Sequence, residues 1–233
     1  MAHKSDLRAL RTGTVINNNS KRQETSLIRA ISGVVERLQS KFPNISLNHE
    51  STWRLSDIVT RLRSEFPEVD FHYYHESSFI RPDGGILSIV SKDNNNYPIL
   101  IAEKKNQGTN DIREEEGKEK QARGNAIERL GKNVIGFRTA MLSESIFPFV
   151  CFGDGCDFAP ESSIIDRVVT IAMFGDINEE YLHNVGGQGL FNRGTFYFQR
   201  DEWTKQEMED RCYSIAEKSV FYYYSKYGEN SFV

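Results

Sequence analysis

The sequence predicts one α/β domain in which a central mixed β-sheet is flanked by helices. Its 233 residues are long enough to bury a substantial core, and its 38% hydrophobic content is typical of a globular protein. Strand-like apolar segments occupy residues 86–90, 97–102 and 149–152. Residues 25–39 carry apolar side chains at the spacing of an amphipathic helix. Strands and helices of this kind in one chain predict helices packed on one main sheet.

The remaining elements follow in chain order. Residues 1–24 are polar and asparagine-rich, which predicts a mobile N-terminal tail, and residues 25–233 form the single domain. A second helix is predicted over residues 55–66. Near the end of the chain, residues 195–198 have the pattern of a strand and residues 203–227 that of a C-terminal helix.

Composition argues against several classes of protein. No apolar run approaches the ~20 residues of a membrane span, and the polar N-terminus predicts no signal peptide, so we expect a cytoplasmic protein. The three cysteines, Cys151, Cys156 and Cys212, are odd in number and lack metal-ligand spacing. They therefore predict neither a disulfide framework nor a zinc site, and we expect them to be buried in the core.

The charge distribution leaves the question of a nucleic-acid partner open. A net charge of −4 speaks against DNA, because neutralising phosphates normally requires a basic surface. Residues 1–63 nevertheless contain eleven Lys or Arg against five Asp or Glu, whereas acids gather in residues 111–128 and beyond residue 176. A basic arm beside acidic surfaces is compatible with DNA binding, although solvated helix faces alone produce the same count.

The most informative stretch of the chain is residues 81–105. Asp83 lies in the turn-forming sequence Arg-Pro-Asp-Gly-Gly, and the apolar strand that follows ends in Ala-Glu-Lys-Lys. Because side chains alternate along a strand, Glu103 and Lys105 point to one face and Lys104 to the other. If the two apolar segments in this stretch pair as an antiparallel hairpin, Asp83 enters the sheet close to where Glu103 leaves it.

This arrangement predicts a magnesium-dependent phosphodiesterase. Asp83 and Glu103 supply the oxygen ligands that Mg²⁺ prefers, and Lys105 can orient the attacking water or neutralise charge that develops on the phosphate. Arg81 is a candidate phosphate clamp, because a guanidinium grips phosphate oxygens at two places. Glu76 is a candidate further metal ligand, although the sequence favours a place for it in a loop beside the DNA or around the metal ligands. The pattern alone is weak, since the polar ends of strands often carry Glu and Lys for solubility.

Four segments, taken in their order along the chain, resemble the EcoRI-like type II restriction endonucleases of the PD-(D/E)XK nuclease superfamily. The segments are SSFIRPDGG at residues 77–85, AEKKNQG at 102–108, GNAIER at 124–129 and MLSESIFPF at 141–149. The hexapeptide is the most specific of them, because it is a rare sequence at a fixed place downstream of the active-site strand. The resemblance implies a restriction-endonuclease-like fold with a catalytic core over about residues 70–175.

The resemblance also implies an activity. It predicts a homodimer that uses Mg²⁺ to cut both strands of double-stranded DNA at a short palindrome and leaves 5′ overhangs. Asp83, Glu103 and Lys105 fall on the catalytic positions of the family, with the two carboxylates holding the metal ion.

The hexapeptide falls on the block through which the family reads bases in the major groove. Asn125 presents a donor and an acceptor that match adenine, and Arg129 offers a planar fork. Gly124 permits close approach of the backbone, Ala126 can lie beside a thymine methyl group, and Glu128 would brace neighbouring side chains. The family comparison suggests AATT at the centre of the site.

One departure from the family leaves the outer bases of the site open. The family uses two arginines three residues apart to help read the outer base pair. Here Arg167 matches one of them, whereas Ile164 occupies the place of the other.

Three alternative functions differ in what they require of the chain. A repair or structure-selective nuclease would share the catalytic residues but read DNA shape, and a catalytically silent relative would bind DNA without cutting. A glycosidase that used Asp83 and Glu103 would need neither a lysine nor a metal ion. The hexapeptide argues against all three alternatives.

Overall fold

A five-stranded mixed β-sheet forms the centre of this computed structural model. The residues that the structure describes are 15–72, 75–106, 108–119, 124–160, 162, 165, 177–183 and 192–233. The strands of the sheet, in chain order, are β1 (Ser46–Glu50), β4 (Ile86–Val90), β5 (Asn96–Asn106), β6 (Phe149–Asp154) and β7 (Thr195–Gln199). The predicted central mixed sheet is therefore confirmed.

The sheet order is β1-β4-β5-β6-β7, with antiparallel pairing from β1 to β5 and parallel pairing from β5 to β7. The predicted hairpin is confirmed, since Ile86 lies opposite Ile101 and the polar turn connects β4 to β5. On the other side of β5, Glu103 lies opposite Cys151 of β6. Strand β5 is thus central in the sheet. Its last residues pair with β6 on one side and face the turn that carries Asp83 on the other.

Three of the described helices match predicted elements, apart from the start of the first one, whereas no helix was predicted over residues 108–115 and 124–140. The described helices are α2 (Val15–Lys41), α3 (Leu55–Glu65), α4 (Gly108–Glu115), α5 (Gly124–Ala140) and α7 (Lys205–Tyr227). Helix α2 begins ten residues earlier than expected, so residues 15–24 are helical rather than part of an irregular tail. The physical reason is that these ten residues contain neither proline nor glycine, so nothing in them stops the helix from extending.

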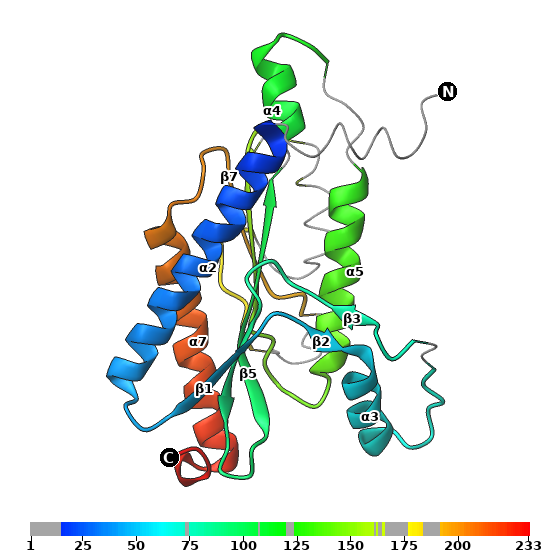
Figure 1. The fold of residues 1–233 in the computed structure, drawn as a ribbon, viewed down its shortest axis with the longest axis vertical. Helices are drawn as coiled ribbons and strands as arrows, with labels where there is room; N and C mark the ends of the chain where they lie inside the picture. The colour runs from blue at the N-terminus through cyan, green and yellow to red at the C-terminus, as the bar shows by residue number, and fades with distance from the viewer. Residues whose placement is uncertain are drawn as a thin grey trace.

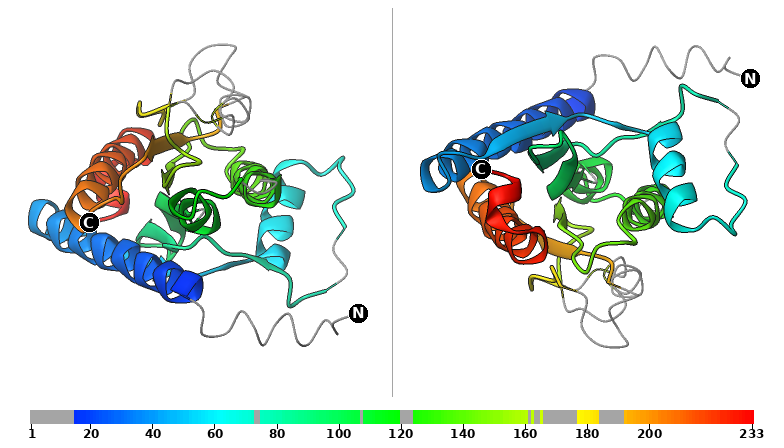
Figure 2. Two further views of the ribbon diagram at one scale, coloured as in Figure 1. Left: turned by 90° about the horizontal axis from the view of Figure 1, so that it is seen from above. Right: turned by 90° about the horizontal axis from the view of Figure 1, so that it is seen from below.

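Helices cover both faces of the sheet (Figure 1). On one face α2 and α7 lie side by side, as the end-on views in Figure 2 also show, and bury side chains such as Leu27, Val34 and Cys212. On the other face α5 buries Leu130 and Phe137 against the sheet. The three cysteines are buried, as predicted. Among the described residues, no helix is both long enough and apolar enough to cross a membrane.

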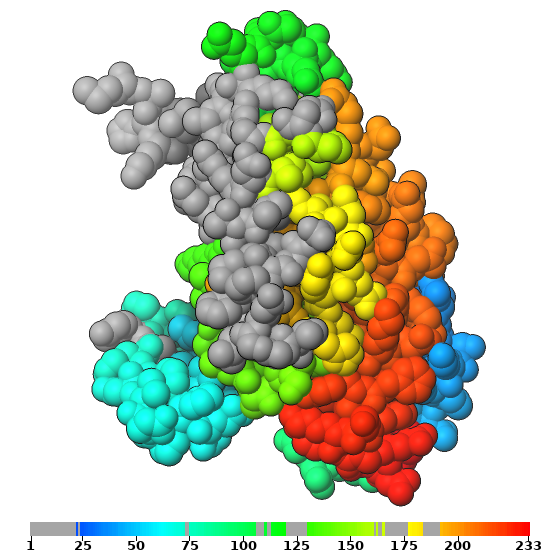
Figure 3. Space-filling view, turned by 180° about the vertical axis from the view of Figure 1, so that it is seen from behind, coloured from blue at the N-terminus to red at the C-terminus, as the bar shows by residue number. Residues whose placement is uncertain are grey.

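A two-stranded sheet and α3 form a separate part of the fold. Strand β2 (Trp53–Arg54) pairs with β3 (Phe79–Ile80), which leads directly into the turn that carries Asp83. Figure 3 shows α3 and the chain that follows it, in cyan, as a lobe that stands out from the body of the molecule. Ile58 and Leu62 hold this lobe against Ala140 at the end of α5.

Candidate active site

The turn that carries Asp83 is held in place by close packing. Gly85 has φ +78°, a conformation that glycine adopts without strain, and a Cβ on Gly84 would lie 2.7 Å from Ile31 Cδ1 of α2. His49 Nε2 lies 2.8 Å from the carbonyl oxygen of Gly84, at hydrogen-bond distance. The two glycines of the motif therefore allow α2 and β1 to pack directly against the turn.

Asp83 and Glu103 meet across a reciprocal pair of hydrogen bonds. The backbone N–H of Asp83 donates to Glu103 Oε2 at 3.0 Å. In return, the backbone N–H of Lys104 donates to Asp83 Oδ2 at 3.2 Å. The sequence analysis predicted this approach from the hairpin, and the structure confirms it.

The ammonium group of Lys105 joins the two carboxylates. It lies 3.2 Å from Asp83 Oδ2 and forms a shorter ion pair with Glu103 Oε1. The exposed fraction of the side chain is 1% for Glu103, 18% for Lys105 and 37% for Asp83. The cluster is therefore buried at Glu103 and opens to solvent at Asp83, where a substrate would approach.

Burial and charge shift the protonation equilibria of these groups. Burial raises the pKa of Glu103, and the charge of Asp83 adds to this effect while Lys105 opposes it. Burial alone would lower the pKa of Lys105, but the charges of Glu103 and Asp83 outweigh it and raise that pKa. Lys105 therefore remains an ammonium ion at neutral pH, which suits it to stabilise negative charge rather than to accept a proton.

Lys104 points to the opposite face of the sheet, as the strand period predicts. Its Nζ lies 3.0 Å from Asp154 Oδ2, and both side chains are at most 3% exposed. The ammonium makes no well-aligned hydrogen bond in the described part of the chain, so the contact with Asp154 is mainly Coulombic. The same Asp154 oxygen accepts the backbone N–H of Trp203 at 3.3 Å. This buried pair ties the end of β5 to β6 and to the start of the C-terminal segment.

One contact of Glu103, the candidate catalytic carboxylate, was not predicted from the sequence. Asn133 of α5 donates from Nδ2 to Glu103 Oε1 at 3.1 Å. Nothing in the local sequence signals this contact, because it depends on how α5 packs against β5. Its position only four residues after the hexapeptide is the one feature that associates Asn133 with the site.

The donor set of the cluster fits a divalent metal ion. The carboxylates of Asp83 and Glu103 come from different segments and lie close enough for the Lys105 ammonium to contact both. The two negative charges would therefore both attract a cation placed between them. Magnesium binds hard oxygen ligands and often takes only one or two protein carboxylates. Asp83 and Glu103 are therefore the residues that would hold it.

The other predicted site residues lie outside the cluster of Asp83, Glu103 and Lys105 or outside the described residues. Arg81 is 59% exposed and lies 3.6 Å from a carboxylate oxygen of Glu24 on α2, whereas Glu76 is exposed in the turn before β3. Residues 124–129 form the N-terminal part of α5, and Arg167 and Ile164 lie outside the described residues. The role of Gly124, Asn125, Ala126, Glu128 and Arg129 in base recognition therefore stays a prediction, made for residues that begin a helix.

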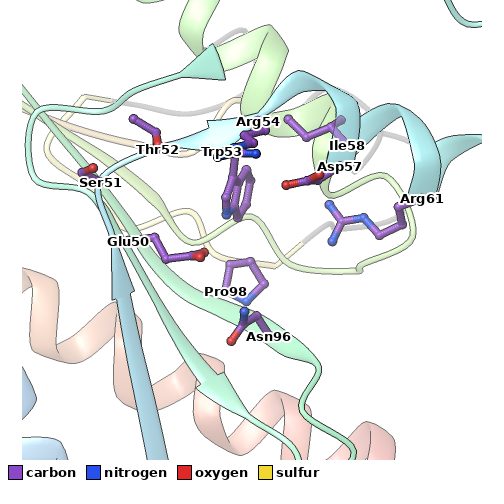
Figure 4. Close-up of a pocket in the computed structure, with 10 residues that line it drawn as sticks. All are labelled: Glu50, Ser51, Thr52, Trp53, Arg54, Asp57, Ile58, Arg61, Asn96 and Pro98. Atoms are coloured by element: carbon purple, nitrogen blue, oxygen red, sulfur yellow. The ribbon is translucent and has the colours of Figure 1, made fainter. Parts of the chain in front are cut away.

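A pocket of about 430 Å³ lies apart from this cluster, between α3 and the start of β5 (Figure 4). Two acidic side chains, Glu50 and Asp57, line it together with Arg54, Arg61 and the ring of Trp53. None of the three clustered catalytic candidates lines this pocket. The polar contacts of the cluster, and not the presence of a hollow, identify the candidate active site.

Comparison with known proteins gives consistent similarities. A family model described as "Restriction endonuclease EcoRI" matches residues 11–230. The chain is 31% identical to the type II restriction enzyme RsrI of Cereibacter sphaeroides over 235 residues, which cover 86% of this chain and 84% of RsrI. It is 32% identical to the type II restriction enzyme EcoRI of Escherichia coli over 142 residues, which cover 58% of this chain and 51% of that enzyme. The family match spans the whole sheet and the helices that cover it.

Proposed function

The chain belongs to the EcoRI family of restriction endonucleases and is a type II site-specific deoxyribonuclease, and we propose that it uses Mg²⁺ to hydrolyse double-stranded DNA at a short palindrome centred on AATT. The observation that carries this proposal is the meeting of Asp83, Glu103 and Lys105 at one point. Two carboxylates and an ammonium ion are the groups that metal-assisted phosphodiester hydrolysis requires.

Each of these side chains has a proposed role. Asp83 and Glu103 hold the metal ion, which when bound polarises the phosphoryl oxygen and lowers the pKa of a water molecule. Lys105, an ammonium ion between the two carboxylates, orients the attacking water or neutralises charge on the phosphate. Arg81 is more than half exposed and is proposed to grip a neighbouring phosphate.

Recognition is proposed to reside at the start of α5. Asn125 and Arg129 would make the bidentate contacts to bases in the major groove, with Gly124, Ala126 and Glu128 in the supporting roles that the family comparison implies. A palindromic site is matched by a protein with two-fold symmetry, so the proposed active species is a homodimer. Arg167 would contribute to reading the outer base pair.

Digestion of a sequenced plasmid with and without Mg²⁺, followed by sequencing of the fragment ends, tests the proposal. The expected result is discrete 5′-overhanging ends around AATT that depend on the metal ion and reveal the outer bases. Random ends would indicate a nonspecific or structure-selective nuclease and would overturn the proposed specificity. No cutting by the purified protein under any metal condition would overturn the proposed activity.

Alanine at Asn125 or Arg129 is expected to weaken discrimination between sites. Each good bidentate contact supplies ~1–3 kcal/mol against the wrong base, and truncation removes it. The measurement is the ratio of cleavage rates on the AATT-centred site and on single-base variants. Asn48→Ala is a matched control, because it also removes an asparagine amide, but one that contacts Asn96 at the start of β5 and does not belong to the proposed recognition segment. An unchanged ratio in both recognition variants would remove these residues from base readout.

The cleavage rate is expected to fall on the acid side at a pH above the ordinary Glu pKa of ~4.3. Burial raises the pKa of Glu103, so this carboxylate takes up a proton at a higher pH than an exposed one. Metal ion and proton compete for the same group, so more Mg²⁺ should move the acid limb to lower pH. Single-turnover rates measured over pH at two Mg²⁺ concentrations provide the check. An acid limb that does not respond to Mg²⁺ would argue against this assignment.

A further inference from the structure

Asn133 contributes a polar contact to the active site from outside the catalytic motif. Its Nδ2 donates at 3.1 Å to Glu103 Oε1, the same oxygen that pairs with the Lys105 ammonium. Glu103 is only 1% exposed, so water has little access to replace a lost donor. The orientation of the carboxylate therefore depends on protein donors, and Asn133 is one of them.

The position of the Asn133 amide follows the position of helix α5. Asn133 lies three residues after Leu130 and four before Phe137, both of which are fully buried against the sheet. Asparagine has a short side chain with two rotatable bonds, so its amide cannot move far unless the helix moves. A shift of α5 relative to β5 would thus change the contact with Glu103.

The same helix begins with the proposed recognition segment. Asn133 lies eight residues after Asn125, about 12 Å along the axis of one continuous helix. A helix with an unbroken hydrogen-bond ladder transmits a displacement of its first turns along its length. The contact between Asn133 and Glu103 is therefore a direct physical connection between the recognition segment and a metal-binding carboxylate.

We propose that Asn133 is a positioning residue that couples the recognition segment of α5 to the metal-binding carboxylate of Glu103. The amide is a neutral donor, so it supports the charged carboxylate without adding a second cation that would repel the metal ion. The inference rests on the proposed function, because it takes Glu103 as a metal ligand and the start of α5 as the base-reading element.

The test uses Asn133→Ala and Asn133→Leu in the full-length enzyme. Loss of a partner that orients a metal ligand typically weakens metal affinity or activity by 10–100-fold, and we expect that range for the maximal cleavage rate and for the half-saturating Mg²⁺ concentration. The KM for DNA, and DNA affinity measured in EDTA, should remain at wild-type values. Calcium binding to the enzyme–DNA complex, measured by calorimetry, should weaken with the same variants and needs no turnover. Leucine retains the volume of the side chain, so it separates loss of the donor from loss of packing.

Asn48→Ala, which also removes an amide contact, is the matched control and should keep wild-type Mg²⁺ dependence. Coupling predicts that the Asn133 variants lose more activity on the AATT-centred site than on single-base variants. An equal loss on both would overturn the connection to recognition, and wild-type Mg²⁺ dependence of Asn133→Leu would overturn the positioning role. Glu103→Ala separates the two proposals. If this variant still cleaves DNA, the assignment of Glu103 as a metal ligand is wrong. If Glu103→Ala is inactive and Asn133→Leu behaves like the wild type, only the positioning role of Asn133 is overturned.

Discussion

Glu103→Ala is expected to abolish DNA cleavage, with a loss of roughly a hundredfold to a thousandfold at least, the range seen when one group that stabilises charge in a transition state is removed. The carboxylate is buried, accepts the backbone N–H of Asp83 and pairs with the Lys105 ammonium. Its removal therefore takes away one of the two proposed metal ligands and leaves the lysine without its closer partner. Lys105→Ala is expected to be similarly inactive. Single-turnover cleavage of a plasmid at saturating Mg²⁺ provides the measurement.

Binding to DNA should largely survive both substitutions, because the side chains of Glu103 and Lys105 are only 1% and 18% exposed and contribute little to the surface that DNA would contact. Fluorescence anisotropy in EDTA or Ca²⁺ measures this binding without turnover. Glu36→Ala, at an exposed position of α2, is a matched control that should cleave at the wild-type rate. Retained cutting by Glu103→Ala would remove the metal-site assignment, whereas loss of both cutting and binding would indicate that the variant is misfolded.

Asp154→Asn is expected to lower the free energy of unfolding by about 3–5 kcal/mol, the effect of leaving one member of a buried ion pair uncompensated. The amide retains the shape of the side chain and an oxygen that can accept the Trp203 N–H. What it removes is the charge opposite Lys104, whose side chain is 3% exposed. Urea denaturation at neutral pH, with the midpoint and slope compared with those of the wild type, measures the change.

The double variant Asp154→Asn, Lys104→Met isolates the charge effect. Methionine replaces the ammonium by an apolar group of similar length, so the double variant should recover much of the lost stability, as well-packed apolar replacements of buried pairs often do. Asp210→Asn removes a carboxylate from the exposed pair with Arg37 and should have little effect, since such pairs contribute little. A double variant no more stable than Asp154→Asn would mean that packing, rather than charge, determines the loss.

Most of the local elements could be predicted from the sequence, because their determinants are local. The two-residue period of the β4–β5 hairpin and the helical spacing of residues 25–39 and 55–66 are properties of short windows, and the structure has strands and helices there. The same period predicted that Lys104 points away from Glu103 and Lys105. The start of α2 was less predictable, because residues 15–24 lack the apolar spacing of an amphipathic helix. The apolar residues of α2 that pack on the core begin only after this segment.

Strands at the edge of the main sheet and in the two-stranded sheet could not be predicted from local sequence patterns. Strand β1 and the short pair β2–β3 have mixed polar sequences, and they form because neighbouring strands are available to pair with them. The contact of His49 with the turn at Gly84 joins residues 35 positions apart and has no local signal. Such contacts depend on register, which the sequence of one strand does not specify alone.

The sequence by itself determined which side chains serve the proposed chemistry: Asp83, Glu103 and Lys105 by type and spacing, and the hexapeptide at residues 124–129 by its resemblance to a family to which the chain belongs. Only the tertiary structure decided how those groups are supported. It buries Glu103 and raises its pKa, and it pairs Lys104 with Asp154 on the opposite face of the sheet. It also brings Asn133 to within 3.1 Å of Glu103, the proposed catalytic carboxylate. The physical reason is range: strand period and residue chemistry act over a few residues, whereas desolvation and hydrogen-bond partners depend on which distant segments pack together.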